Sequence, residues 1–247
     1  MEKLLVASLL VLSSTSFAAT QTWDFVGSGG VSSLNRNIVP NSIKLSDNDN
    51  TMSVTMTAWS AYNDENIFQS ELWLSQWGTL VYNANGEAHW TDNVGRYDFV
   101  LLSFDQDVEL SGISISNYMT DSDISIAAFD SNPFEGGSAM TRWNQVSGYA
   151  LSSSSFSNVG SSPLNQYYAL DSGANQAKTT AGTSASYWLI GAYNQYFGGG
   201  LSAGDDNLKF SGLTTKTSDT TQVSAPASLS LFAFALLAFA GRRKKLR

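Results

Sequence analysis

Short segments with strand-like patterns recur along most of this chain, and they constrain its fold more than any other feature. In residues 51–59, Met52, Val54 and Met56 alternate with Ser and Thr, as in a strand with one buried face. Similar patterns predict strands at residues 97–104, 109–116, 123–129, 187–193 and 207–213. The glycine inside the second of these, Gly112, is typical of a β-bulge.

Clusters of Gly, Asn, Asp and Ser separate these segments and predict turns, because such residues tolerate the backbone conformations that turns require. They lie at residues 27–30, 47–50, 83–86, 132–137, 152–155 and 198–204. Many short strands with frequent turns favour an all-β domain, and we expect a single jelly-roll-like β-sandwich. A helical turn is an additional expectation at residues 63–76, where Ile67, Leu72 and Trp73 share a helical face.

The two ends of the chain differ from this body. Lys3 and the apolar residues 4–12 resemble the first two regions of a secretory signal peptide, with cleavage expected between Ala18 and Ala19. A membrane helix is less favoured there, because the apolar run is short. We therefore divide the chain into a signal peptide (1–18), a β-sandwich domain (19–213), a flexible linker (214–222) and a C-terminal tail (223–247).

Charge and cysteine content exclude several classes of function. Residues 19–222 contain seven Lys and Arg but twenty Asp and Glu, a formal charge of −13. A domain this acidic offers no basic surface to nucleic acid, although it attracts cations. The chain has no cysteine, which excludes thiol catalysis, cysteine zinc sites and disulfides.

Few residues suggest catalysis. His89 is the single histidine, and the chain has no Gly-x-Ser-x-Gly motif, so a serine triad is not indicated. The glutamates of the body lie in no recognisable motif, and we expect a protein that is not an enzyme. A glycoside hydrolase remains a weaker alternative, because it requires two carboxyl groups on either side of the bond that is cleaved.

Calcium is a more plausible ligand, since it prefers oxygen ligands from loops. Oxygen-rich stretches occur at residues 47–50, 121–123 and 204–207, although the first lacks the glycine and glutamate of an EF-hand loop. If the first and last strands are neighbours, Asp24 on the first strand can meet Asp205 and Asp206, which precede the last strand. Ordinary turn chemistry is the alternative interpretation of these acids.

The chain is rich in tryptophan. Trp73, Trp77 and Trp90 could stack on sugar rings if they are exposed, whereas burial in the core is the common role of such side chains. A surface that exposes three or more tryptophans on one face would favour sugar binding.

The C-terminal tail combines an apolar segment with a basic end. Residues 225–241 are at the short end for crossing about 30 Å of hydrocarbon. The apolar side chains of this predicted membrane helix are Leu229, Leu231, Phe232, Phe234, Leu236, Leu237 and Phe239. The basic residues that follow it are Arg242, Arg243, Lys244, Lys245 and Arg247. We expect a stop-transfer segment whose basic end stays in the cytoplasm.

This tail resembles the PEP-CTERM sorting signal of bacterial exosortase substrates. The motif Val223-Ser224-Ala225-Pro226 stands where that signal commonly has Pro-Glu-Pro, and the apolar helix and basic cluster follow in the same order. The body also resembles exosortase-dependent surface proteins, at residues 92–105, 120–129, 156–160 and 186–213. The resemblance implies export, transient insertion in the inner membrane, cleavage by an exosortase-type enzyme, and release to the cell surface or extracellular matrix. It implies no catalytic residue.

Two functions follow as expectations. The first is a structural or adhesive surface protein in a polysaccharide-rich matrix or biofilm, whose partners are the processing enzyme, the membrane and extracellular polysaccharide. The second is a lectin-like carbohydrate-binding module, with calcium as a candidate cofactor.

Overall fold

The computed structural model describes residues 18–26, 42–62, 65–82, 90–136, 140–157, 164–170, 180–198 and 200–217. Thr20–Thr217 form one compact unit, and Met1–Ala19 with Ser218–Arg247 form another. Of the second unit, the described residues include only Ala18 and Ala19. The rest of the predicted signal peptide, the sorting motif, the membrane helix and the basic end therefore lie outside the described residues, as does His89.

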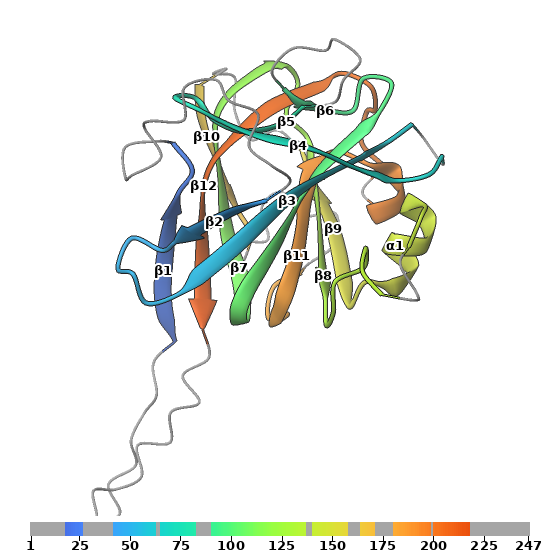
Figure 1. Cartoon of the computed structure of the whole chain (residues 1–247). Coiled ribbons are helices and arrows are strands. Elements are labelled where there is room, and N and C mark those ends of the chain that lie inside the picture. Colours follow the sequence, from blue (N-terminus) through green and yellow to red (C-terminus); the bar gives the residue numbers. More distant parts are fainter. Residues whose placement is uncertain are drawn as a thin grey trace, which may run out of the picture. The chain divides into compact units, whose positions relative to one another are not determined.

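The described residues are mostly strands, which confirms the all-β prediction (Figure 1). The strands are β1 (Ala19–Asp24), β2 (Ile43–Ser46), β3 (Ser53–Ala61), β4 (Phe68–Ser75), β5 (Gly78–Tyr82), β6 (Thr91–Asp92), β7 (Tyr97–Thr120), β8 (Ile124–Phe129), β9 (Ser152–Phe156), β10 (Leu164–Ala169), β11 (Ala185–Ala192) and β12 (Asp206–Thr217). One short α-helix, α1 (Trp143–Tyr149), and one 3₁₀ turn, η2 (Gln195–Phe197), accompany them.

Three predictions about local structure are wrong. The helical turn expected at residues 63–76 is the strand β4, in which Leu72 is buried and pairs with Val81 of β5. The serines at 152–155 form strand β9 rather than a turn, because they pair with β8. Residues 214–217 continue β12 and are not part of a linker. In each case pairing with another strand decides the conformation.

Five strands close a small barrel in the order β12, β5, β4, β3, β7 and back to β12. Phe210 of β12 pairs with Thr79 of β5 on one side and with Ile115 of β7 on the other, which completes the circuit. The remaining strands lie outside this circuit: β11, β8 and β9 extend from β7, β10 pairs with β7, β2 pairs with β3, and β1 and β6 pair with β12. The jelly-roll description of this arrangement remains a prediction.

Strand β7 is long, and its two halves pair with different neighbours in the barrel. Its first half pairs with β3 and β11, and its second half pairs with β12 and β10. The predicted strands at 97–104 and 109–116 are thus one continuous element. Thr214 and Thr215 are consecutive on β12, but their partners on β7, Gly112 and Leu110, are separated by one residue. Strand β7 therefore has one extra residue at this point. This irregularity confirms the bulge expected at the glycine.

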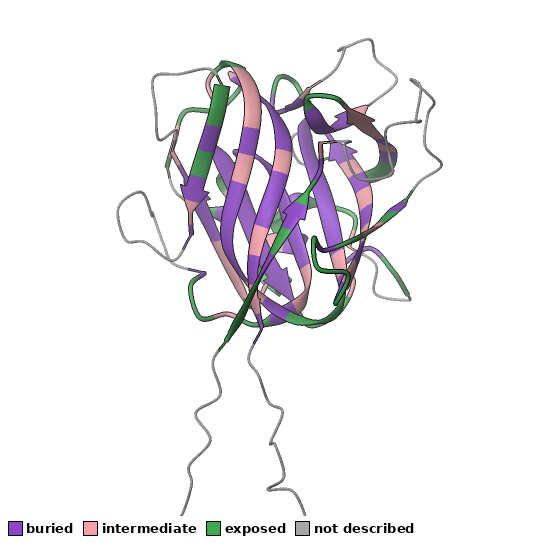
Figure 2. Cartoon of the chain, turned by 90° about the vertical axis from the view of Figure 1, so that its left-hand side faces the viewer, coloured by how far each residue is buried: buried purple, intermediate pink, exposed green. Residues whose placement is uncertain are grey.

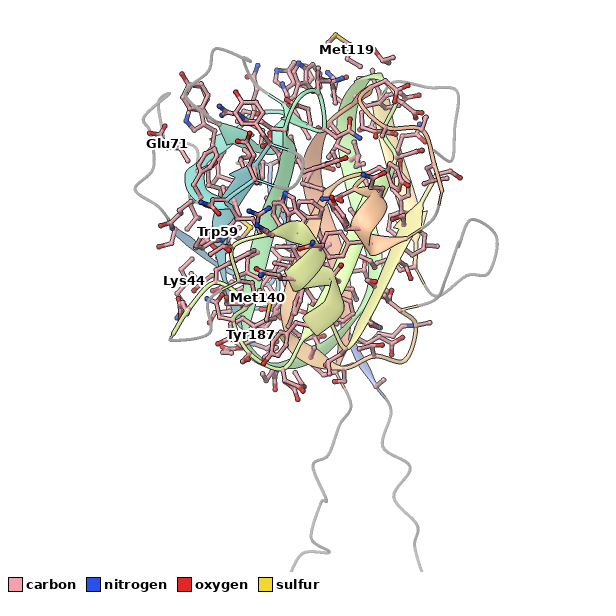
Figure 3. The ribbon with its side chains drawn as sticks, turned by 90° about the vertical axis from the view of Figure 1, so that its right-hand side faces the viewer. Lys44, Trp59, Glu71, Met119, Met140 and Tyr187 are labelled. Atoms are coloured by element: carbon pink, nitrogen blue, oxygen red, sulfur yellow. The ribbon has the colours of Figure 1, made fainter. Side chains whose placement is uncertain are left out.

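Two hydrophobic cores hold the unit together. The larger core lies between the inward faces of the strands, where Val54, Met56, Ile113 and Phe210 are buried. A second core lies between the outer face of β7, β8 and β11 and the segment around α1. Figure 3 shows α1 in front of this face, with Trp59 and Met140 near it. Trp143 of α1 is fully buried against Phe99, with ring centroids 4.7 Å apart.

Candidate metal centre

Three carboxyl groups converge at the end of the unit where β7 ends and β12 begins (Figure 1). Asp121 and Asp123 belong to the link from β7 to β8, and Asp206 is the first residue of β12. One carboxylate oxygen of each residue lies within 4.8 Å of the others. Met119, two residues before Asp121, marks this end of the unit in Figure 3. These three residues are called the acid cluster below.

Backbone hydrogen bonds bring the two oxygen-rich stretches together. The amide of Asp121 donates to the carbonyl of Asp205 at 3.2 Å, and the amide of Asn207 donates to the carbonyl of Asp121 at 3.2 Å. Just before this contact, Thr120 has a φ of 66°, a left-handed conformation that turns the chain out of β7. The acid cluster is therefore fixed by strand pairing rather than by a flexible loop.

Asn93 fastens Asp206 from a third segment, next to β6. Its Nδ2 donates to Asp206 Oδ2 at 2.5 Å and to the carbonyl of Tyr193 at 2.9 Å. Its Oδ1 accepts from the amides of Asp206 at 3.0 Å and Gly204 at 3.1 Å. One buried amide side chain thus uses both of its ends to connect β6, β11 and β12.

Asp206 is completely buried, and the pKa of its carboxyl group is raised to about 8, with burial as the largest cause. The negative charges of Asp123 and Asp121 contribute to this rise, whereas hydrogen bonds oppose it. Those bonds come from the Asp123 amide to Oδ1, at 2.7 Å, and from Asn93. Near neutral pH, the carboxyl group of Asp206 is therefore mostly protonated.

Tyr168 of β10 covers the acid cluster from another side. Its hydroxyl donates to the carbonyl of Ser122 at 2.6 Å and lies 2.8 Å from the Ser122 hydroxyl. Burial raises the pKa of the Tyr168 hydroxyl, and the charges of Asp123, Asp121 and Asp206 act in the same direction. The tyrosine thus stays neutral and serves as a hydrogen-bond donor.

The acid cluster can hold either a calcium ion or a proton. Calcium lies 2.3–2.6 Å from its oxygen ligands, so two ligands of one ion lie within roughly 5 Å of each other. The spacing of up to 4.8 Å among the three carboxylates fits that requirement. The three carboxylates repel one another when all are ionised. A proton on Asp206 reduces this repulsion without a metal, because it removes one of the three negative charges.

The residues predicted as calcium ligands, Asp24, Asp205 and Asp206, do not all lie together in the structure. Asp206 belongs to the cluster, and the carbonyl of Asp205 supports it by accepting from Asp121. Strands β1 and β12 are indeed neighbours, but Phe25 bonds to Ser211, so Asp24 lies five or more residues along β12 from Asp206. Asp24 is exposed, and its Oδ1 accepts from the amide of Val26 at 2.7 Å.

Sequence reasoning missed the partnership of Asp121, Asp123 and Asn93 with Asp206. The stretch 121–123 is rich in oxygen ligands, but nothing in its sequence pattern shows which distant acids it meets. The first oxygen-rich stretch has a structural role, since Asp47 Oδ1 accepts from the amides of Thr51 and Met52. Burial alone would raise the pKa of Asp47, but these bonds and the one from the Thr51 hydroxyl lower it.

The other candidate residues do not form an open site among the described residues. Trp77 is the single exposed tryptophan, at 50%; Trp59, Trp73 and Trp90 are half-buried, and Trp23, Trp143 and Trp188 are buried. The row of three exposed tryptophans that would favour sugar binding is thus absent from the described residues. The described glutamates, Glu65, Glu71, Glu109 and Glu135, lie on separate elements, and Glu87 lies outside the described residues.

No helix in the described part of the chain is long and apolar enough to span a membrane. Comparisons with protein-family models, with curated proteins and with solved structures found no significant match to this chain.

Proposed function

We propose that this chain is an exported bacterial surface or extracellular-matrix protein with a structural or adhesive role and no catalytic activity. An exosortase-type enzyme sorts it and cleaves its tail after transient insertion in the inner membrane. The proposal includes the jelly-roll-like character of the domain, and it takes the acid cluster as a structural feature that calcium can stabilise.

The position of the folded unit within the chain carries this proposal. Strand β1 begins at Ala19, directly after the predicted signal cleavage site, and β12 ends at Thr217, before the sorting motif. The two strands are antiparallel, since the side chain of Gln21 donates to Thr217 and that of Trp23 donates to Thr215. The first and last residues of the unit thus lie at the same end of one strand pair. Removal of both terminal segments would leave every described strand intact.

Mass spectrometry of the mature protein tests the proposal. We expect an N-terminus at Ala19 and a C-terminus near Val223–Pro226, in protein recovered from the cell surface or the medium. A variant in which Arg242, Arg243, Lys244, Lys245 and Arg247 are replaced by Gln should remain unprocessed, whereas Lys216→Gln, outside the tail, should be processed normally. A mature protein that still ends at Arg247 would refute the sorting function.

A calcium-dependent carbohydrate-binding module is the alternative function. The tryptophans do not favour it, because each half-buried one already has a neighbour against its ring. Trp59 stacks on Phe134 at 4.2 Å, Trp73 stacks on Tyr82 at 4.5 Å, and Lys209 lies 4.5 Å from the ring of Trp90. A different part of the surface has the features of a sugar site.

A further inference from the structure

The outward face of β7, β10 and β12 carries short uncharged side chains and one exposed aromatic ring. Ile113 and Ile115 of β7 point into the core, so Gly112, Ser114 and Ser116 face outward. Tyr167 of β10 pairs with Ser114, and Thr214 of β12 pairs with Gly112. These five residues are called the serine face. Figure 2 looks onto this side of the unit, where half-buried and exposed positions alternate with buried ones.

Tyr167 leans across this face over Gly112 rather than standing upright. A Cβ added at Gly112 would lie 2.5 Å from Cζ and 2.7 Å from Cε2 of Tyr167, so the ring occupies the space that a side chain at 112 would fill. The hydroxyl end of the ring therefore lies over the backbone of β7. The residue remains 49% exposed, which leaves a large part of the ring open to solvent.

A second aromatic residue, Trp77, lies beside β7 at Ser116, four residues along the strand from Gly112. The hydroxyl of Ser116 donates to the carbonyl of Trp77, which lies in the turn between β4 and β5. The side chain of Trp77 is 50% exposed. Gly112 and Ser116 are four residues apart, or about 13 Å at the usual rise of a strand. The two aromatic residues thus lie near opposite ends of a strip that includes the hydroxyls of Ser114 and Ser116.

The charge of this strip narrows the ligand class. The domain as a whole carries a formal charge of −13, which repels anionic chains, whereas the serine face includes no Asp, Glu, Lys or Arg. Beyond Gly112, the nearest charges on β7 and β12 are Glu109 and Lys216, which lie opposite each other in register and offset one another. Beside Ser116, Lys209 of β12 lies opposite Asn117, but it is only 8% exposed and its ammonium group lies 4.5 Å from the centre of the Trp90 ring. An uncharged ligand matches this face, whereas a polyanion does not.

We propose that the serine face binds an uncharged polysaccharide, whose chain runs along β7 from Tyr167 toward Trp77. The C–H groups on the flat side of a sugar ring carry partial positive charge and pack against the electron-rich face of an aromatic ring. The hydroxyls of Ser114 and Ser116 bond to the sugar hydroxyls between the two aromatic contacts. This site extends the adhesive role proposed above by naming a ligand class, and it does not depend on how the tail is processed.

Tyr167 also has a plausible structural role, because an aromatic ring that covers a strand glycine stabilises the sheet. The test must therefore separate binding from folding. Tyr149 of α1 provides a matched control, since it is the same residue type and is equally exposed at 49%.

Affinity can be measured by isothermal titration of the full chain, purified from cells that export it, with uncharged hexasaccharides of glucose (β-1,4 and β-1,3), mannose and N-acetylglucosamine. Hexagalacturonate serves as the anionic comparison. We expect saturable binding of at least one uncharged probe and none of the anionic one. Tyr167→Ala and Trp77→Ala should each weaken binding about tenfold or more, equal to 1.4 kcal/mol, whereas Tyr167→Phe and Tyr149→Ala should leave it within a factor of about two. Thermal unfolding of each variant confirms that it is folded.

Three results would overturn the proposal. One is the absence of saturable binding to every uncharged probe. Another is binding that survives in folded Tyr167→Ala and Trp77→Ala proteins. The third is concentration-dependent self-association that Tyr167→Ala abolishes while no sugar binds, which would assign this face to contact between copies. None of these results bears on the C-terminus of the mature protein, so the sorting function is tested separately.

Discussion

Raising the pH from about 5 to about 7.5 should destabilise the folded unit, because Asp206 binds a proton more tightly in the folded chain than in the unfolded one. Its pKa is about 8 in the fold and 3.8 as the reference value for an unperturbed aspartate. Between these values the folded state holds more protons than the unfolded state. Stability is therefore fully present below about pH 4 and is lost as the pH rises through about 8.

The expected magnitude follows from the linkage relation. One proton bound more tightly by the folded state changes the free energy of unfolding by about 1.4 kcal/mol per pH unit. The interval from pH 5 to pH 7.5 therefore corresponds to a loss of about 3 kcal/mol, and screening of the partly exposed Asp121 makes this an upper value. Because domains are typically stable by about 5–15 kcal/mol, a loss of this size is measurable.

Urea unfolding at fixed ionic strength, with a chelator present, measures this slope. Asp206→Asn should remove most of the pH dependence, while Asp130→Asn, which changes an exposed carboxyl group, should leave it unchanged. Any pH dependence that persists in Asp206→Asn comes from groups other than Asp206. A wild-type stability that is flat or rises between pH 5 and 7.5 would show that Asp206 is ionised in the fold and that the reasoning is wrong.

Further predictions concern the cation and the packing of the barrel. Calcium at millimolar concentration should raise the melting midpoint of the wild type but not of Asp206→Asn, since a ligand at 100 times its Kd adds about 2.7 kcal/mol to the free energy of unfolding. Equal shifts in both proteins would show that calcium binds elsewhere. Gly191→Ala should cost about 1–3 kcal/mol in urea unfolding, because the new Cβ would lie 2.5 Å from Cδ1 of Phe99. Gly148→Ala, in α1 with open space around it, should instead stabilise by up to about 1 kcal/mol, and equal costs at both positions would contradict the packing argument. Trp143→Ala should cost about 3–5 kcal/mol by calorimetry, whereas Trp143→Phe should cost clearly less, because the buried Nε1 of this tryptophan has no hydrogen-bond partner.

The strands that face a core on one side could be predicted from the sequence. In β3 the buried residues Val54, Met56 and Ala58 alternate with half-buried ones. Strand β8 could also be predicted from its apolar residues, although all of its residues are buried because a core lies on each of its faces. Strand β9 gave no such signal, because its sequence Ser-Ser-Ser-Ser-Phe is typical of a turn. Its conformation is decided by pairing with β8, from Ile124 opposite Phe156 to Ala128 opposite Ser152.

The candidate site, like the strands, is only partly predictable from the sequence. Residues 121–123 and 204–207 are rich in oxygen ligands and the domain is acidic, and both facts can be predicted from composition alone. That Asp206 meets Asp121 and Asp123 rather than Asp24 depends on the fold, because the register of β12 against β7 and β1 sets which residues are neighbours. Tyr167 acquired its half-exposed position in the same way, from a glycine that lies far away in the sequence but on the adjacent strand. Local patterns report how far each residue is buried, whereas contacts between distant segments depend on strand order and register, which no single segment encodes.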